Sequence, residues 1–115
     1  MSDKKYRDWI RTMPSFLDGQ FKEYVNGEGR NPACHVLRAA TSGKGYKGDF
    51  RCVPMTQEQH LYQHQHGELA CLLRFAKGIV FTPTVEGAKE CFDRHVEIYR
   101  KVWEREHANR TKRVG

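Results

Sequence analysis

Apolar residues recur at helical spacing near the N-terminus. They occupy positions i, i+3, i+4 and i+7 as Tyr6, Trp9, Ile10 and Met13. Pro14 follows the last of them and cannot continue a regular helix. The pattern therefore predicts an amphipathic helix within residues 1–14.

A longer apolar stripe of the same period runs through the C-terminal part of the chain. Its members are Ala88, Phe92, Val96, Tyr99 and Trp103. Thr84 is a suitable N-cap, and Lys and Arg gather toward the end, where they suit the helix dipole. We expect a helix over residues 84–108, followed by a basic tail.

The middle of the chain holds short apolar runs of the kind that form strands. Residues 34–37 and 50–53 are two such runs, and they would pair as an antiparallel hairpin across a Ser/Gly/Lys-rich loop. Residues 15–32 are polar and rich in glycine, which predicts a long loop with room for one helical turn near residues 21–25.

Two helices are expected after the second strand. Thr56 and Gln59 have the spacing of a capping box, which predicts a helix that begins there and ends near Gly67. A shorter helix follows over residues 69–76. The expected architecture is a single α+β domain over residues 1–115, with a hairpin-plus-helix core over residues 33–67.

Charge and cysteine content narrow the functional classes. The formal net charge of +6 favours a polyanionic partner, although many basic domains bind no nucleic acid. The four cysteines form no Cys-x-x-Cys pair, so reduced structural thiols are expected. The chain has no apolar run of membrane-spanning length and begins with polar residues, from which we expect a cytoplasmic protein without a membrane partner.

The histidines carry the most chemical information. His60 and His64 are four residues apart, so on a helix both imidazoles lie on one face and can reach one divalent ion. The alternative is a solvated polar helix whose histidines have no ligand. His35 lies in the first predicted strand, and an uncoordinated imidazole there can act as a general base for water. The alternative for His35 is a structural hydrogen bond to a carbonyl.

Basic residues surround the loop between the two predicted strands. Lys44, Lys47 and Arg51 are candidates for gripping phosphates without reading bases, and a solvated loop is the alternative.

Several of these segments resemble the small HNH-like (ββα-metal) endonucleases of phages and prophages, including the group of the Ref recombination nuclease and the YbcO-type proteins. The similar segments are Trp9-Ile10-Arg11 with Met13-Pro14, Cys34-His35-Val36-Leu37-Arg38, Val53 to Glu68, and Cys91-Phe92-Asp93. The resemblance covers most of the chain except residues 19–31 and 69–83. It implies metal-dependent DNA cleavage in a bacterial host, in phage recombination or DNA processing, with a recombinase or another DNA-processing protein as a further partner.

The resemblance also implies roles for individual residues. His35 matches the general base, while His60 and His64 match metal ligands on the helix. Cys34 stands where a further ligand on the first strand is found. Asp49 falls near the residue that orients the base, and Arg38 is close enough to His35 to hold the scissile phosphate. The metal remains open among Zn²⁺, Mg²⁺, Mn²⁺ and Ni²⁺.

One departure from the family pattern is informative. Relatives carry two pairs of Cys or His that bind a structural zinc, and the corresponding positions here are Ser15, Asp18, Thr56 and Gln59. We therefore expect no structural zinc. The same loss keeps an alternative function open, that of a catalytically inactive module that binds DNA or a protein partner.

Overall fold

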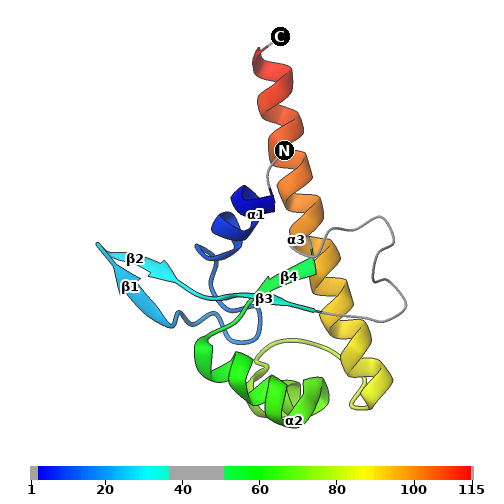
Figure 1. Ribbon diagram of the computed structural model, residues 1–115. Helices are drawn as coiled ribbons and strands as arrows, with labels where there is room; N and C mark the ends of the chain where they lie inside the picture. The colour runs from blue at the N-terminus through cyan, green and yellow to red at the C-terminus, as the bar shows by residue number, and fades with distance from the viewer. Residues whose placement is uncertain (1–2, 37–50, 115) are drawn as a thin grey trace.

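The computed structural model describes the backbone of residues 3–36 and 51–114, and the side chains of residues 4–36 and 51–106. Its described part is a mixed α+β fold with three helices and two small antiparallel hairpins (Figure 1). The elements are α1 (Asp3–Ile10), β1 (Glu23–Val25), β2 (Glu28–Arg30), β3 (Ala33–His35), β4 (Cys52–Pro54), α2 (Gln57–Phe75) and α3 (Val85–Val114). The α+β class predicted from the sequence is confirmed. None of the described helices combines the length and the apolar character needed to cross a membrane.

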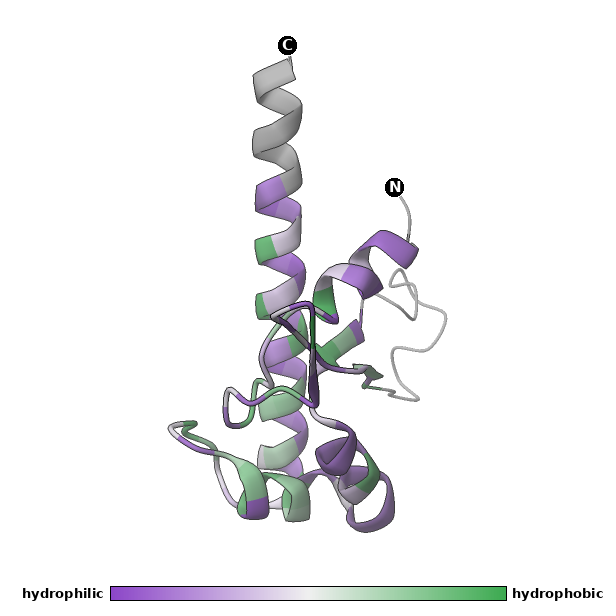
Figure 2. Cartoon of the chain, turned by 90° about the vertical axis from the view of Figure 1, so that its left-hand side faces the viewer, coloured by the Kyte–Doolittle hydropathy of each residue, from purple (hydrophilic) through white to green (hydrophobic). Residues whose placement is uncertain are grey.

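The main hydrophobic core lies between α2, α3 and the β3–β4 hairpin. Its largest fully buried side chains are Phe92, Leu17, Met55 and Leu72. A second cluster joins α1 to the middle of α3, where the ring of Tyr6 meets that of Trp103 edge-on at 5.4 Å. The apolar stripes predicted in the two terminal helices thus form the faces by which α1 and α3 pack. Figure 2 shows apolar residues in the segments that pack on α3, which are α2 and the β3–β4 hairpin.

The N-terminal half of the predicted loop 15–32 is irregular, but its second half is a hairpin. Glu23 pairs with Arg30 and Val25 with Glu28, so the prediction of a loop with a helical turn is wrong for this part. Asn26 and Gly27 form the turn with φ of 52° and 82°. Two consecutive positive φ angles suit a two-residue hairpin turn, for which Asn-Gly is the preferred sequence.

α2 begins at the predicted residue and is broken at the predicted glycine. Thr56 is the N-cap, and its side chain and that of Gln59 complete the capping box. Gly67 interrupts the helix with φ 92° and ψ 171°, a conformation that only glycine adopts readily. The helix resumes beyond it to Phe75. The two predicted helices are therefore two arms of one element joined at a glycine kink.

Candidate functional site

The β3–β4 hairpin leads into α2 and positions the first candidate residue. His35 pairs with Cys52, and Cys34 pairs with Val53. Because side chains alternate along a strand, Cys34 and His35 point to opposite faces of the hairpin. Cys34 is buried in the core, whereas His35 is exposed. The hairpin thus presents one imidazole to solvent beside the start of α2.

His60 and His64 bring their rings together on the first arm of α2. Their Nε2 atoms lie 2.8 Å apart and their ring centroids 4.5 Å apart. At this distance one neutral ring donates its N–H and the other accepts it. Two nitrogens bound to one tetrahedral ion at 2.0–2.1 Å lie about 3.4 Å apart, so the pair needs to open by only about half an ångström to share an ion. The donor set fits a divalent metal.

The pKa of His60 is affected both by His64 in the pair and by His35 on the hairpin. Burial of the ring lowers its pKa, and the positive charges that His64 and His35 can carry lower it further. The three imidazoles therefore lie close enough to influence one another. A His60 ring that stays neutral is also in the form that binds metals, since a protonated nitrogen has no lone pair to donate.

Two protein nitrogens do not complete a metal site. Within the described residues, no three His, Cys, Asp or Glu side chains are grouped closely enough to hold an ion together. A metal on His60 and His64 would take its remaining ligands from water or from substrate oxygens, as catalytic metals do.

The predicted ligand Cys34 is placed away from the histidine pair. Its side chain is fully buried and its Sγ lies 3.6 Å from the carbonyl oxygen of Pro32. Burial raises the pKa of the Cys34 thiol to about 12. Because the thiolate is the form that binds metals, this placement argues against the ligand role.

The predicted phosphate contact Arg51 also has a different position. Its side chain is buried, Nε donates to the carbonyl oxygen of Val36, and a terminal nitrogen lies 2.8 Å from Oδ1 of Asp93 on α3. Arg51 thus ties β4 to α3 and is not part of an exposed loop. The other predicted residues between the strands lie outside the described residues; they are Arg38, Lys44, Lys47 and Asp49.

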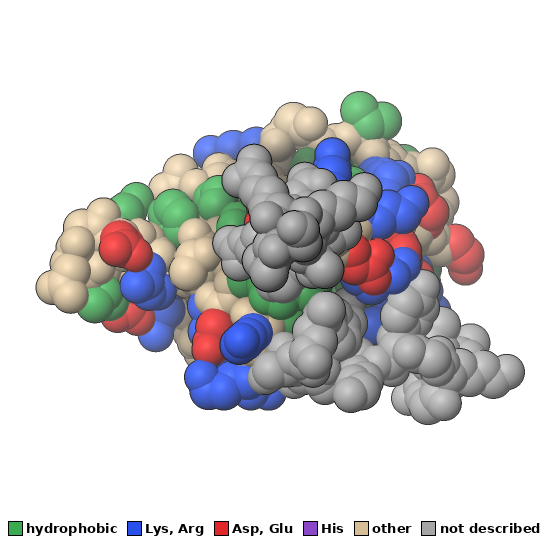
Figure 3. Space-filling view, turned by 90° about the horizontal axis from the view of Figure 1, so that it is seen from above, with side chains coloured by type: hydrophobic (Ala, Val, Ile, Leu, Met, Phe, Trp, Pro, Cys, Tyr) green, Lys and Arg blue, Asp and Glu red, His purple; other side chains and the backbone are tan. Residues whose placement is uncertain are grey.

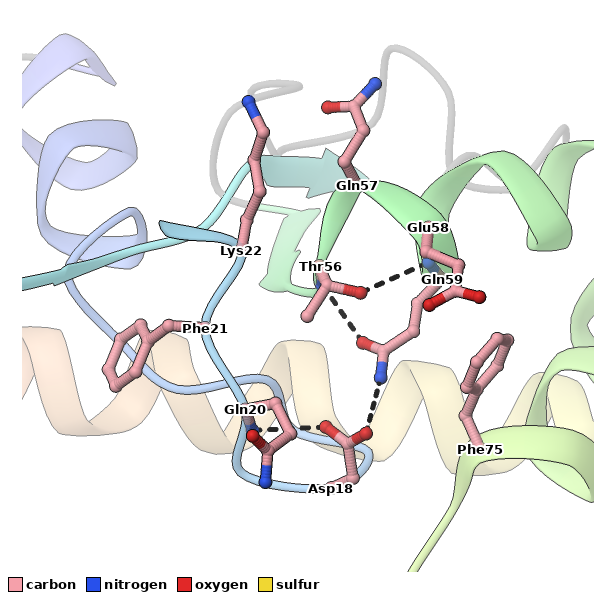
Figure 4. A pocket seen from close by; sticks show the side chains of 9 residues that line it. All are labelled: Asp18, Gln20, Phe21, Lys22, Thr56, Gln57, Glu58, Gln59 and Phe75. Atoms are coloured by element: carbon pink, nitrogen blue, oxygen red, sulfur yellow. Dashed lines mark hydrogen bonds between the residues drawn. The ribbon is translucent and has the colours of Figure 1, made fainter. Parts of the chain in front are cut away.

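The four residues matched to zinc-ligand positions do come together. Gln59 is at the centre (Figure 4) and is almost fully buried. Its Nε2 donates to Oδ2 of Asp18 at 2.8 Å, while its Oε1 accepts from the Ser15 hydroxyl at 2.6 Å and from the Thr56 N–H at 3.0 Å. Thr56 completes the group by accepting from the Gln59 N–H. Hydrogen bonds therefore join the segment after α1 to the first turn of α2 at these four positions.

The sequence indicated only part of this cluster. The capping box gave Thr56 and Gln59 local roles, but nothing along the chain showed that the Gln59 side chain would be buried. Its partners Ser15 and Asp18 are 44 and 41 residues away. Such a long-range polar contact has no periodic signature.

Comparison with models of known protein families, with curated proteins and with solved structures finds no match to this chain.

Proposed function

We propose that this protein is a metal-dependent DNA endonuclease of the HNH type. The observation that carries the proposal is the contact of the His60 and His64 rings on the helix that directly follows the antiparallel hairpin of His35. A hairpin and helix that carry one exposed imidazole and two imidazoles in contact have the residues for two tasks, namely activating water and holding a metal.

The roles follow from the placement of each ring. His60 and His64 would hold the ion, because their Nε2 atoms converge on one face of the helix. His35 is exposed, and we assign it the base that takes a proton from the attacking water. When bound, the metal supplies charge to stabilise the phosphate oxygens of the substrate. The net charge of +6 favours a polyanionic substrate.

The test is nicking of supercoiled plasmid by the purified full chain with Mg²⁺, Mn²⁺ or Zn²⁺. His35→Ala and His60→Ala should each reduce the rate by at least about 100-fold, since each removes a group that acts in the transition state. His66→Ala is the matched control. It changes an exposed histidine of the same helix whose ring lies against Tyr62 instead, 4.4 Å between centroids.

A metal-binding measurement distinguishes the ligand role of His60 from the base role of His35. Co²⁺ bound to imidazoles gives a visible absorption spectrum, which His60→Ala should abolish and His35→Ala should retain. Cleavage that survives His60→Ala would exclude the proposed site.

The alternative function is a catalytically inactive module that binds DNA. Only one observation favours it: the described residues give a metal two ligands and no third. Plasmid binding without nicking in any metal, by a folded protein, would establish this alternative.

A further inference from the structure

The excess positive charge of the chain is concentrated in two segments. Residues 1–36 and 51–99 together carry eleven Lys and Arg and eleven Asp and Glu, so this part has no net charge. Residues 37–50 carry three basic residues and one acidic residue, and residues 100–115 carry six basic and two acidic residues. Two thirds of the net charge of +6 therefore belongs to the last sixteen residues.

Positive and negative side chains are also balanced on the surface of the main body of the fold, that is, residues 4–36 and 51–99. On the face in Figure 3, Lys and Arg side chains in the described part lie beside Asp and Glu side chains. The ion pairs of the described part include Lys4 with Asp8 and Arg94 with Glu90. Basic residues of the body are thus largely neutralised by acidic neighbours.

Residues 104–114 of this segment form the free end of α3, with four basic and two acidic residues. Trp103 is the last side chain of the helix buried against the rest of the fold, and the residues after it that are described are exposed. The helix continues to Val114 and extends beyond every other element (Figure 1). Eleven residues at 1.5 Å each make this extension about 16 Å long.

The composition of the extension identifies the partner that suits it. Between residues 104 and 113 the only apolar residue is Ala108, so the extension has no stripe with which to pack on another protein. Beyond Glu106 it contains no acidic residue and three basic ones, Arg110, Lys112 and Arg113. A polar helix end of one charge sign is complementary to a chain of phosphates.

We infer that the projecting end of α3 is a separate DNA-binding element, which holds the phosphate backbone at a distance from the histidine site. This inference rests on the proposed function for the choice of DNA as the polyanion. The helix from Asp93, beside β4, to Val114 spans about 31 Å. A duplex bound along this length would be contacted over about nine base pairs.

The test measures binding of a random-sequence duplex against salt concentration, in EDTA so that no cleavage occurs. The variant R110Q/K112Q/R113Q should lower the slope of log K against log salt by about 2 to 3, since each lost phosphate contact contributes about 0.9. The control K4Q/K5Q/K77Q removes the same charge from exposed positions of the body and should leave the slope close to that of the wild type.

Two outcomes would overturn the inference. The first is an equal slope for R110Q/K112Q/R113Q and the control variant. The second is an unchanged DNA slope together with lost binding to vesicles of 30% phosphatidylglycerol, which would assign the helix end to a membrane surface. Nicking activity does not enter these measurements, so failure of the proposed nuclease function would be seen separately in the plasmid assay.

Discussion

Gln59 donates a hydrogen bond from Nε2 to Oδ2 of Asp18, and this bond connects residues that are 41 positions apart in the chain. The same amide oxygen accepts from Ser15 and from the Thr56 backbone. One buried side chain thus satisfies groups from two segments. Its loss leaves the buried Ser15 hydroxyl, and the half-buried Asp18 carboxylate and Thr56 N–H, without this partner, which costs more than the net gain of a single hydrogen bond.

We expect Gln59→Ala to lower the free energy of unfolding by about 3 kcal/mol, because an unsatisfied buried polar group costs about 1–3 kcal/mol. Gln57→Ala, on the same turn of α2 but exposed, should change it by less than about 0.5 kcal/mol. Urea denaturation followed by far-UV circular dichroism measures both. Equal midpoints for the two variants would show that the cluster does not stabilise the fold.

Gly67 should be intolerant of any side chain. Its φ of 92° and ψ of 171° lie in a region that residues with a Cβ avoid, at a cost of about 1–3 kcal/mol. Gly67→Ala and Gly67→Asn should both destabilise the protein, because asparagine tolerates the left-handed helical region but not this one. Thermal denaturation measures the effect, with Gln65→Ala on the exposed face as the control. A stable Gly67→Ala variant would mean that α2 does not need the kink.

The pKa of the His60 ring should lie below its ordinary value of 6.5. Burial opposes protonation of the ring, and so do the charges of the neighbouring His64 and His35. The unfolded chain then binds more protons than the folded one, so this ring makes the protein less stable as pH falls below 6.5. NMR titration of the imidazole ¹⁵N signals measures the midpoint. His64→Ala and His35→Ala should each raise it, and His66→Ala should not. An unchanged midpoint in His35→Ala would show that the rings are not close.

Arg51 should be required for stability and dispensable for binding phosphates. Arg51→Ala removes a buried guanidinium that pairs with Asp93 and with the carbonyl oxygen of Val36, which we expect to cost about 2–3 kcal/mol. Arg105→Ala removes the same charge from the exposed surface of α3 and should have little effect on stability. Urea denaturation together with DNA binding checks both variants. A stable Arg51→Ala protein with weakened DNA binding would restore the role predicted from sequence.

Elements with one buried face were predictable from the sequence. The stripes of α1 and α3 gave the helices, and the capping residues Thr56 and Gln59 gave the start of α2. The β1–β2 hairpin was not predicted, because Tyr24 and Val25 are exposed and no alternation of buried and exposed positions marks the strands. Its signal was the Asn26-Gly27 dipeptide, which specifies the turn directly.

The candidate site was predictable where spacing alone decides geometry. The interval of four between His60 and His64 predicted that both rings lie on one face of a helix, and in the structure their Nε2 atoms lie 2.8 Å apart. Cys34 was predicted as a further metal ligand, but it is buried while His35 is exposed, because alternation along a strand places neighbours on opposite faces. Arg51 was assigned to a loop because no local pattern shows that its partner is Asp93, 42 residues later.

The four cysteines supply a way to follow how the molecule opens. Cys34, Cys52, Cys71 and Cys91 belong to β3, β4, α2 and α3, and each is fully buried and outside any disulfide. A thiol reagent can reach each sulfur only when the element that carries it separates from its neighbours. The native chain therefore holds one natural reporter in each of these elements, and the four modification rates would give their order of release during unfolding.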